Sequence, residues 1–166
     1  LGRLTNDEKK QHYYQVIHHE SGRLTYLVNN ILEFSRIEAN RKVYHFENRD
    51  MNEIVKKLYS NYSFSFIESK VKCNLSIWEE KINIKVDSHA FEEALSNLIE
   101  NAIKYSDKHK NIDIITTVDN QYGYCHVKDN GVGIPKDLQD LIFEKFYRVE
   151  DALTQKTKGT GLGLSL

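Results

Sequence analysis

The sequence predicts an α+β fold, in which helices cover one face of a mixed, mostly antiparallel sheet, preceded by a long helix of a helical bundle. Between residues 7 and 38, apolar side chains recur every seven residues, as at Ile17, Leu24 and Ile31. This is the spacing of a helix that packs against other helices. After residue 40, short runs alternate between apolar and polar residues, as strands do, and helical segments separate these runs.

The change of period predicts two parts, a partial bundle helix over residues 1–41 and an α+β domain over residues 42–166. Asp50 and Asp87 each precede a helical apolar pattern and are predicted to cap the helices that follow. The domain is expected to contain, in order, a strand over 42–47, a helix over 51–69, a hairpin of 71–78 with 81–86, a helix over 88–105, a hairpin of 112–118 with 122–129, a glycine-rich turn, a short helix over 136–146, a polar loop over 150–158 and a second glycine-rich turn.

Composition is that of an ordinary folded domain, with 40% hydrophobic and 28% charged residues among 166, enough for one well-buried core. The net charge of -1, with both signs interspersed, offers no basic surface, so we expect no nucleic-acid partner. Cys73 and Cys125 have no Cys or His at metal-ligand spacing, which favours a reducing compartment. No apolar run approaches the roughly 18 residues that span a bilayer. We therefore expect a cytoplasmic location, with any membrane anchor outside these residues.

Three polar residues share a narrow face of the predicted helix over 88–105. Asn97, Asn101 and Lys104 fall within about a sixth of the helix circumference, beside the apolar stripe. A carboxamide oxygen can bind a hard cation such as Mg2+, and a lysine can bind phosphate. The alternative is an ordinary solvated helix face, and these residues alone do not decide between the two.

Two glycine-rich turns follow later in the chain. Residues 129–135, Asp-Asn-Gly-Val-Gly-Ile-Pro, come after a predicted strand, and their glycines allow positive φ and close approach of the backbone to a ligand. Residues 159–164, Gly-Thr-Gly-Leu-Gly-Leu, offer successive backbone N–H groups to an anion. This second turn lacks the Gly-Lys-Ser/Thr of a Walker A loop and the leading strand of a dinucleotide fingerprint. Either turn alone could be a simple connection.

Together these features resemble a known family. Their order, an Asn-bearing helix, an Asp-x-Gly-x-Gly turn, a polar loop and a Gly-x-Gly-x-Gly turn, resembles the N, G1 and G2 boxes of the histidine-kinase branch of the Bergerat (GHKL) ATPases. Residues 143–148, Phe-Glu-Lys-Phe-Tyr-Arg, are similar to its F box, and residues 32–39, Leu-Glu-Phe-Ser-Arg-Ile-Glu-Ala, to the end of the second helix of its dimerisation domain. The resemblance covers nearly the whole chain and implies a Bergerat-type α/β sandwich.

The resemblance implies the ATP-binding catalytic region of a two-component sensor histidine kinase. Such a protein uses Mg-ATP to transfer the γ-phosphoryl group to a histidine, for relay to an aspartate on the receiver domain of a response regulator. It also implies a homodimer formed through the helical bundle. These are expectations about activity, cofactors and partners that follow from the family.

The resemblance further implies roles for individual residues. Asn101 would hold the Mg2+ that bridges the phosphates, beside Asn97, and Asp129 would accept a hydrogen bond from the adenine amino group. Arg148 would neutralise charge on the transferred phosphoryl group, and Glu100 would orient the acceptor histidine. The other residues expected around the nucleotide are Lys104, Tyr105, Gly131, Gly133, Ile134, Phe146, Gly159, Thr160, Gly161, Leu162 and Gly163.

The phospho-acceptor is expected to lie outside these residues. His19 begins a run, His-Glu-Ser-Gly-Arg, that looks like an acceptor box, but the proline of the box is absent and the helix aligns with the second helix of the dimerisation domain. We therefore expect His18 and His19 to be surface residues and the acceptor to precede Leu1. The family also continues past its G2 box, so we expect the domain to be truncated at its C-terminus.

The residues leave two alternatives to a kinase open. One is a nucleotide-binding or dimerisation module without phosphotransfer activity. The other is a different Bergerat ATPase of the Hsp90, gyrase or MutL type, or an anti-sigma serine kinase. Members of this second group lack the preceding bundle helix and the box at residues 143–148, which favours the kinase.

Overall fold

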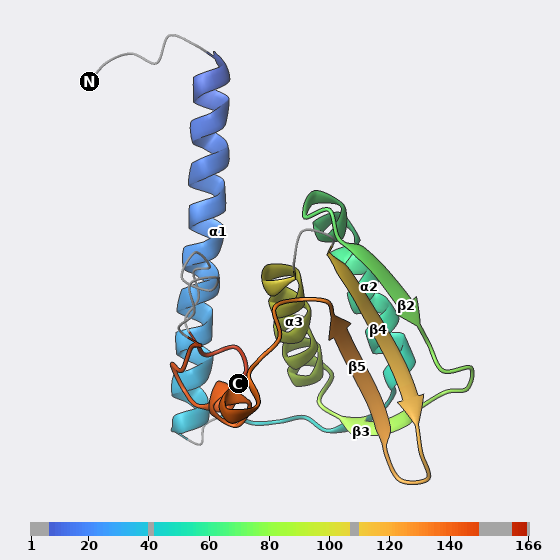
Figure 1. Ribbon diagram of the computed structural model, residues 1–166. Helices are drawn as coiled ribbons and strands as arrows, with labels where there is room; N and C mark the ends of the chain where they lie inside the picture. Colours follow the sequence, from blue (N-terminus) through green and yellow to red (C-terminus); the bar gives the residue numbers. More distant parts are fainter. Residues whose placement is uncertain (1–6, 40–41, 107–109, 150–160, 166) are drawn as a thin grey trace. The chain divides into compact units, whose positions relative to one another are not determined.

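The chain forms two compact units, Leu1–Lys42 and Val43–Leu166 (Figure 1). The structure is a computed structural model, and it describes residues 7–39, 42–106, 110–149 and 161–165.

The first unit contains helix α1, Asp7–Glu38, which confirms the long helix predicted over these residues. Many of its described apolar side chains are exposed, and a single helix has nothing of its own against which to bury them. Among the described residues, no helix is long and apolar enough to cross a lipid bilayer. The exposed apolar residues of α1 are Tyr13, Tyr14, Val16, Ile17, Leu24, Val28, Ile31 and Leu32.

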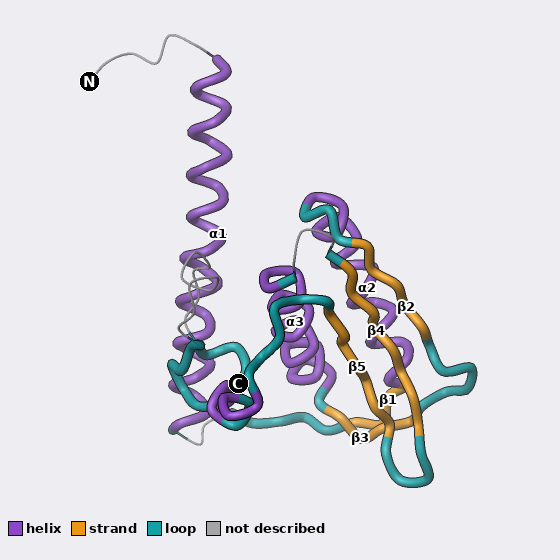
Figure 2. The backbone as a smooth tube through the Cα atoms, in the orientation of Figure 1, coloured by secondary structure: helices purple, strands orange, loops and turns teal. Residues whose placement is uncertain are grey.

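The second unit is built from five strands and two long helices among its described residues (Figure 2). In chain order these are β1, Glu47–Asp50; α2, Met51–Glu68; β2, Lys72–Ser76; β3, Asn83–Val86; α3, Ser88–Tyr105; β4, Asn111–Val118; and β5, Gly123–Asp129.

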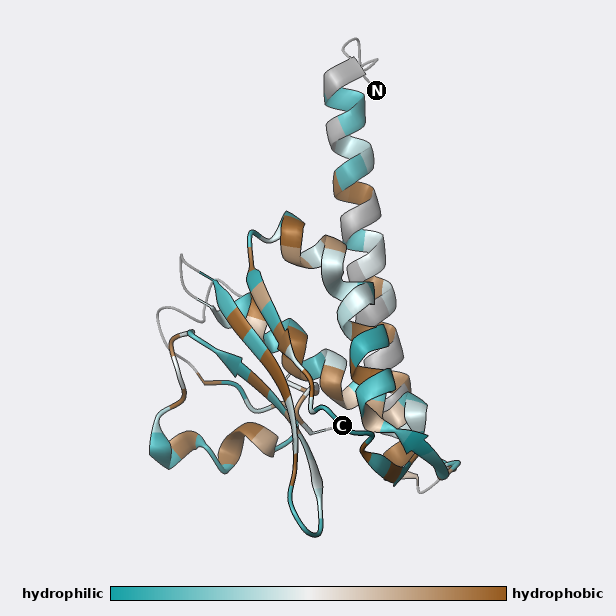
Figure 3. Ribbon diagram, turned by 90° about the vertical axis from the view of Figure 1, so that its right-hand side faces the viewer, coloured by the Kyte–Doolittle hydropathy of each residue, from teal (hydrophilic) through white to brown (hydrophobic). Residues whose placement is uncertain are grey.

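The strands form two small sheets. Strands β1 and β3 pair antiparallel, whereas the larger sheet has the order β2-β4-β5, with a parallel pair β2-β4 and an antiparallel pair β4-β5. Polar and apolar residues alternate along the strands of the larger sheet (Figure 3). The α+β class is therefore confirmed, and two of the three strand pairs are antiparallel.

Helices α2 and α3 pack on one face of the larger sheet. Every second side chain of β4 is buried, and these buried side chains share one core with side chains of both helices. Ile112 and Ile114 of β4 have no exposed surface, nor does Ile99 of α3. Burial of these side chains is the main favourable contribution to the fold. The core consists of Met51, Val55, Leu58, Phe66, Ile82, Leu95, Ile99, Ala102, Ile112 and Ile114.

Both predicted helix caps are confirmed. Asp50 Oδ1 accepts a hydrogen bond of 3.0 Å from the backbone N–H of Asn52 at the start of α2. Asp87 Oδ1 accepts one of 3.0 Å from the N–H of Ala90 at the start of α3. Each carboxylate satisfies a donor that the first helical turn leaves without a partner.

The hairpin predicted from residues 71–78 and 81–86 is wrong. Strand β2 pairs with β4, and β3 pairs with β1, so the two runs belong to different sheets. The segment between them is held instead by buried Asn52, whose Nδ2 donates to the carbonyls of Trp78 and Glu80 at 3.2 and 2.8 Å. Asn52 Oδ1 accepts a hydrogen bond of 2.8 Å from Thr116, which fixes the same segment to β4.

Two local predictions also differ from the structure. The predicted strand over residues 42–47 is wrong, because β1 starts at Glu47 and residues 42–46 form neither strand nor helix. The predicted short helix over 136–146 is instead two 3-10 turns, Lys136–Leu138 and Leu141–Phe143. Each turn is closed by an i to i+3 hydrogen bond, and Glu144 then adopts an extended backbone that ends the second turn.

Candidate functional site

Asn97 of α3 lies against the second glycine-rich turn. Its side chain is only 7% exposed. A Cβ added to Gly163 would lie 3.5 Å from Asn97 Oδ1, and the neighbouring Leu162 has no exposed surface. The described part of this turn, residues 161–165, is therefore packed onto the helix that carries the predicted polar face.

The C-terminal end of α3 is joined to the first glycine-rich turn. Ser106 forms an isolated antiparallel bridge with Gly131, and the carbonyl of Tyr105 accepts a hydrogen bond of 3.4 Å from Val132. A Cβ on Gly131 would lie 2.5 Å from that carbonyl oxygen, so only glycine permits this approach. Asp129 Oδ1 accepts a hydrogen bond of 2.7 Å from the Gly131 N–H and so shapes the turn.

Gly161 is joined to residues 143–148. Its carbonyl accepts a hydrogen bond of 3.0 Å from the Phe146 N–H. Gly161 has a φ of +73°, and a Cβ there would lie 2.7 Å from the carbonyl carbon of Phe146. Phe146 itself has a positive φ of 62° and is exposed. A backbone hydrogen bond thus joins two segments 15 positions apart, and the backbone conformation at position 161 favours glycine.

The remaining predicted residues of α3 have different surroundings. Asn101 and Lys104 are partly buried, and Lys104 Nζ lies 4.7 Å from the centre of the Tyr105 ring. Glu100 faces α2, because its Oε1 accepts a hydrogen bond of 3.0 Å from the hydroxyl of Tyr62. This contact could not be predicted from residue spacing, since Tyr62 lies 38 positions away on another helix.

Gly133 differs from the other described glycines of the two turns. It has a φ of +71°, yet no heavy atom lies within 4 Å of the position where its Cβ would be. Gly131 and Gly161 are explained by close packing within the chain, whereas Gly133 leaves space beside the turn. The following Ile134 is 40% exposed. Arg148 is also exposed.

Some predicted residues fall outside the described part of the chain. Gly159 and Thr160 belong to residues 150–160, which are not described. The backbone of His18 and His19 is part of α1, but their side chains are not described, so their surface position stays a prediction.

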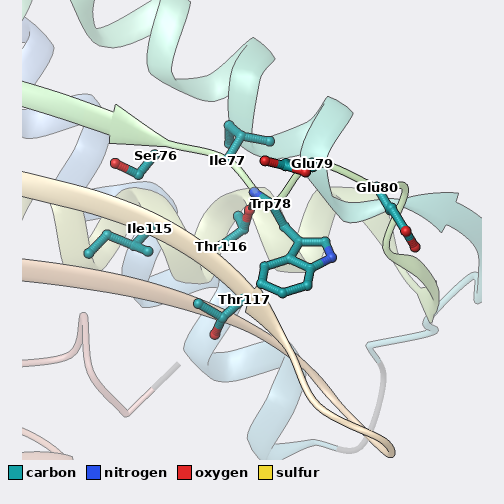
Figure 4. Close-up of a pocket in the computed structure, with 8 residues that line it drawn as sticks. All are labelled: Ser76, Ile77, Trp78, Glu79, Glu80, Ile115, Thr116 and Thr117. Atoms are coloured by element: carbon teal, nitrogen blue, oxygen red, sulfur yellow. Dashed lines mark hydrogen bonds between the residues drawn. The ribbon is translucent and has the colours of Figure 1, made fainter.

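A surface pocket lies elsewhere in the second unit, where β2 ends and β4 approaches its hairpin (Figure 4). Its volume is about 510 Å³. Asp129, however, pairs with Ile112 at the other end of β4. The pocket is therefore separate from the candidate site. Its lining residues are Ser76, Ile77, Trp78, Glu79, Glu80, Ile115, Thr116 and Thr117.

Comparison with known proteins identifies the class. Residues 86–166, which contain α3 and both glycine-rich turns, match the family described as histidine kinase-, DNA gyrase B-, and HSP90-like ATPase. This region is similar to the ATPase domains of that family. The chain as a whole is homologous to sensor histidine kinases, as the sequence predicted.

Among its relatives is the signal transduction histidine-protein kinase ArlS of Staphylococcus epidermidis, which is 33% identical over 147 residues. The alignment covers 89% of this chain but only 32% of ArlS, so the chain spans about a third of that relative.

Two solved structures share the fold. Full-length ShkA in complex with AMPPNP has a TM-score of 0.77 at 22% identity, over 99% of this chain and 33% of that chain. The histidine kinase ThkA in complex with the response regulator TrrA has a TM-score of 0.69 at 23% identity, over 89% of this chain and 42% of that chain.

Proposed function

We propose that this chain binds Mg-ATP around α3 and supplies the catalytic part of a sensor histidine kinase. In this proposal residues 1–41 contribute to a dimerisation and phosphotransfer domain, and residues 42–166 form the catalytic domain. The γ-phosphoryl group goes to a histidine outside these residues and then to an aspartate of a response regulator. The proximity of Asn97 to Gly163 carries the proposal, because it places the second glycine-rich turn beside the helix that bears the predicted polar face.

The adenine would bind beside the first glycine-rich turn. Asp129 uses Oδ1 to hold the Gly131 N–H, and its other carboxylate oxygen would accept a hydrogen bond from the adenine amino group. The space beside Gly133 supports a ligand on that side of the turn, and Ile134 would contribute apolar contact. Gly131 would act indirectly, by letting the turn approach Tyr105.

The phosphates would lie along α3, towards the second glycine-rich turn. Asn101, beside Asn97, would supply a neutral oxygen ligand to Mg2+, and Lys104 would contact phosphate. Among the described residues, no three His, Cys, Asp or Glu side chains form a metal-binding group. A single amide oxygen such as that of Asn101 suits a metal that takes most of its other ligands from phosphate and water. The proposed lid and remaining pocket residues are Tyr105, Phe146, Gly159, Thr160, Gly161, Leu162 and Gly163.

Bound Mg-ATP would supply the phosphoryl group to be transferred. Arg148 is exposed and would neutralise charge on that group as it moves. Glu100 would orient the acceptor histidine, while its hydrogen bond to Tyr62 restricts the carboxylate. These two assignments follow from the family resemblance and from the exposure or contacts of each residue.

The proposed partners are a second copy of the protein and a response regulator. The exposed apolar residues of α1, including Leu24 and Ile31, support association through a helical bundle. The structure of ThkA in complex with the response regulator TrrA supports a response regulator as a partner. A cytoplasmic site of action is proposed because the family's catalytic domain requires intracellular ATP.

ATP titration with and without Mg2+ tests the nucleotide site. We expect Asn101→Ala to remove the dependence of ATP affinity on Mg2+, because it deletes the proposed oxygen ligand. Asn74→Ala is the matched control, since Asn74 is exposed on β2 and hydrogen-bonds Asp113. An unchanged Mg2+ dependence in Asn101→Ala would contradict the assignment.

Phosphotransfer needs a separate test, on a chain extended at its N-terminus to include the proposed acceptor. Incubation with ATP labelled at the γ position is expected to give an acid-labile label on the protein. Nucleotide binding without such a label would favour the alternative, a nucleotide-binding or dimerisation module without phosphotransfer activity.

A further inference from the structure

The carboxylate of Asp87 holds two different segments of the second unit. Its Oδ1 caps α3 through the N–H of Ala90 at 3.0 Å. Its Oδ2 accepts a hydrogen bond of 2.7 Å from the backbone N–H of His45, which is 42 positions earlier in the chain. A hydrogen bond to a carboxylate is stronger than one between neutral groups. One side chain therefore ties residues 43–46 to the helix that carries Asn97.

Residues 43–46 have little burial to fix them. They form neither helix nor strand, and the side chains of Val43 and Phe46 are 73% and 60% exposed. The rings of Tyr44 and Phe46 lie 6.0 Å apart, which is contact within the segment and not with the core. Directional hydrogen bonds consequently matter more here than apolar packing.

The position of Asp87 explains why a side chain is needed. Glu47 of β1 pairs with Val86, the last residue of β3, and α3 begins at Ser88. Once the chain turns into the helix, its backbone no longer continues alongside β1. The Asp87 carboxylate takes over as acceptor for the next part of the incoming chain and so extends the attachment to His45.

We propose that Asp87 is a positioning residue that fixes the segment joining the two units to the start of the nucleotide helix α3. The attachment of the second unit to the chain that leads from α1 then begins at His45 and not at β1. For catalysis, which rests on the function proposed above, this sets how many residues separate α1 from the attached part of the second unit. It therefore sets the length of chain between the ATP site and the domain proposed to hold the acceptor histidine. A shorter flexible linker raises the effective concentration of one site at the other.

Asp87→Asn separates the two tasks of this side chain. Asparagine is also a good helix cap and keeps Oδ1 for Ala90, but its NH2 group replaces the acceptor that faces His45. Ser88→Ala is the control, because Ser88 is adjacent and its hydroxyl makes only a 3.4 Å contact with Glu47. Both variants are expected to fold, since the core is untouched.

Amide hydrogen exchange followed by NMR tests the attachment in the 166-residue chain. We expect the His45 amide to exchange at least about tenfold faster in Asp87→Asn than in wild type, with Ala90 protected in both. Ser88→Ala should match wild type. An unchanged His45 exchange rate in Asp87→Asn would overturn the proposal.

The positioning role is tested by ATP affinity and by phosphotransfer rate in the N-terminally extended chain. We expect ATP affinity within about twofold of wild type and transfer slowed by at least about twofold, because the cap remains and the linker lengthens. Faster His45 exchange with an unchanged transfer rate would overturn the positioning role. Failure of the wild type to bind ATP would refute the proposed function, whereas the His45 measurement would still test the attachment.

Discussion

Gly163 lies so close to Asn97 that an added Cβ would be 3.5 Å from the Asn97 amide oxygen. The second glycine-rich turn is thus seated on α3 at the residue that begins the predicted polar face. Gly161, two positions earlier, accepts a backbone hydrogen bond from Phe146 and so links the same turn to residues 143–148. The turn consequently touches two of the proposed functional segments at once.

Gly161→Ala and Gly163→Ala should behave differently. Alanine at 161 would require a positive φ and would place Cβ 2.7 Å from the Phe146 backbone, which costs about 1–3 kcal/mol or displaces the turn. Alanine at 163 would make ordinary contact with Asn97. We expect Gly161→Ala to speed amide exchange over residues 161–165 and weaken ATP binding, with Gly163→Ala much closer to wild type. Equal effects of the two variants would contradict this account.

Asp129→Ala is expected to lower ATP affinity by about tenfold or more, since it removes both the proposed base contact and the hydrogen bond that shapes the turn. Asp129→Asn separates these effects, because its amide oxygen can still accept from Gly131. We expect the asparagine variant to keep the turn but lose preference for ATP over GTP. Calorimetric titration with both nucleotides measures this, and wild-type ATP affinity in the alanine variant would show that the proposed pocket is misplaced.

Glu100→Gln tests a catalytic role against a structural one. Glutamine can still accept the hydrogen bond from Tyr62, so stability should change little, while phosphotransfer should slow by at least about tenfold. Tyr62→Phe is the matched variant. It should lower the free energy of unfolding by about 1 kcal/mol and leave the transfer rate nearer to wild type. If both variants lose stability and activity in parallel, Glu100 acts only through its contact with α2.

The two cysteines predict a loss of stability at alkaline pH. Burial raises the pKa of the Cys125 thiol from 9.0 to about 11, and burial together with nearby Asp113 raises the pKa of Cys73 to about 11. The folded state disfavours the thiolate, so this contribution to stability is complete below pH 9 and is lost as the pH rises towards 11. Denaturant unfolding of wild type and of a variant with both cysteines changed to alanine measures it. The variant should show a smaller decline over that range, and identical declines would refute the prediction.

Local sequence patterns predicted the three long helices and the β4–β5 hairpin well. The bounds of α1 and α3 and the caps at Asp50 and Asp87 followed from apolar periodicity and from residues that satisfy the first helical turn. Patterns of this kind act over a few residues and can be recognised without the rest of the fold.

The pairing of strands distant in the sequence could not be predicted in the same way. The runs on either side of Glu79 alternate like a hairpin, but β2 pairs with β4, and β3 with β1. Buried Asn52 holds the intervening segment through the carbonyls of Trp78 and Glu80, and it is itself bonded to Thr116, 64 positions away. No local pattern reveals such a partner, because alternation states which face is buried and not which strand lies alongside.

By itself, the sequence predicted the α+β class, the order of the long helices and the resemblance of four segments to the N, F, G1 and G2 boxes of histidine kinases. Only the tertiary structure decided which glycines are required by packing within the chain. Gly131 and Gly161 approach backbone at Tyr105 and Phe146, whereas Gly133 faces open space. It also revealed that the Glu100 carboxylate accepts a hydrogen bond from the Tyr62 hydroxyl and that the Asp87 carboxylate accepts one from the His45 backbone N–H. These contacts join residues distant in the chain, and their existence depends on three-dimensional proximity that residue spacing does not encode.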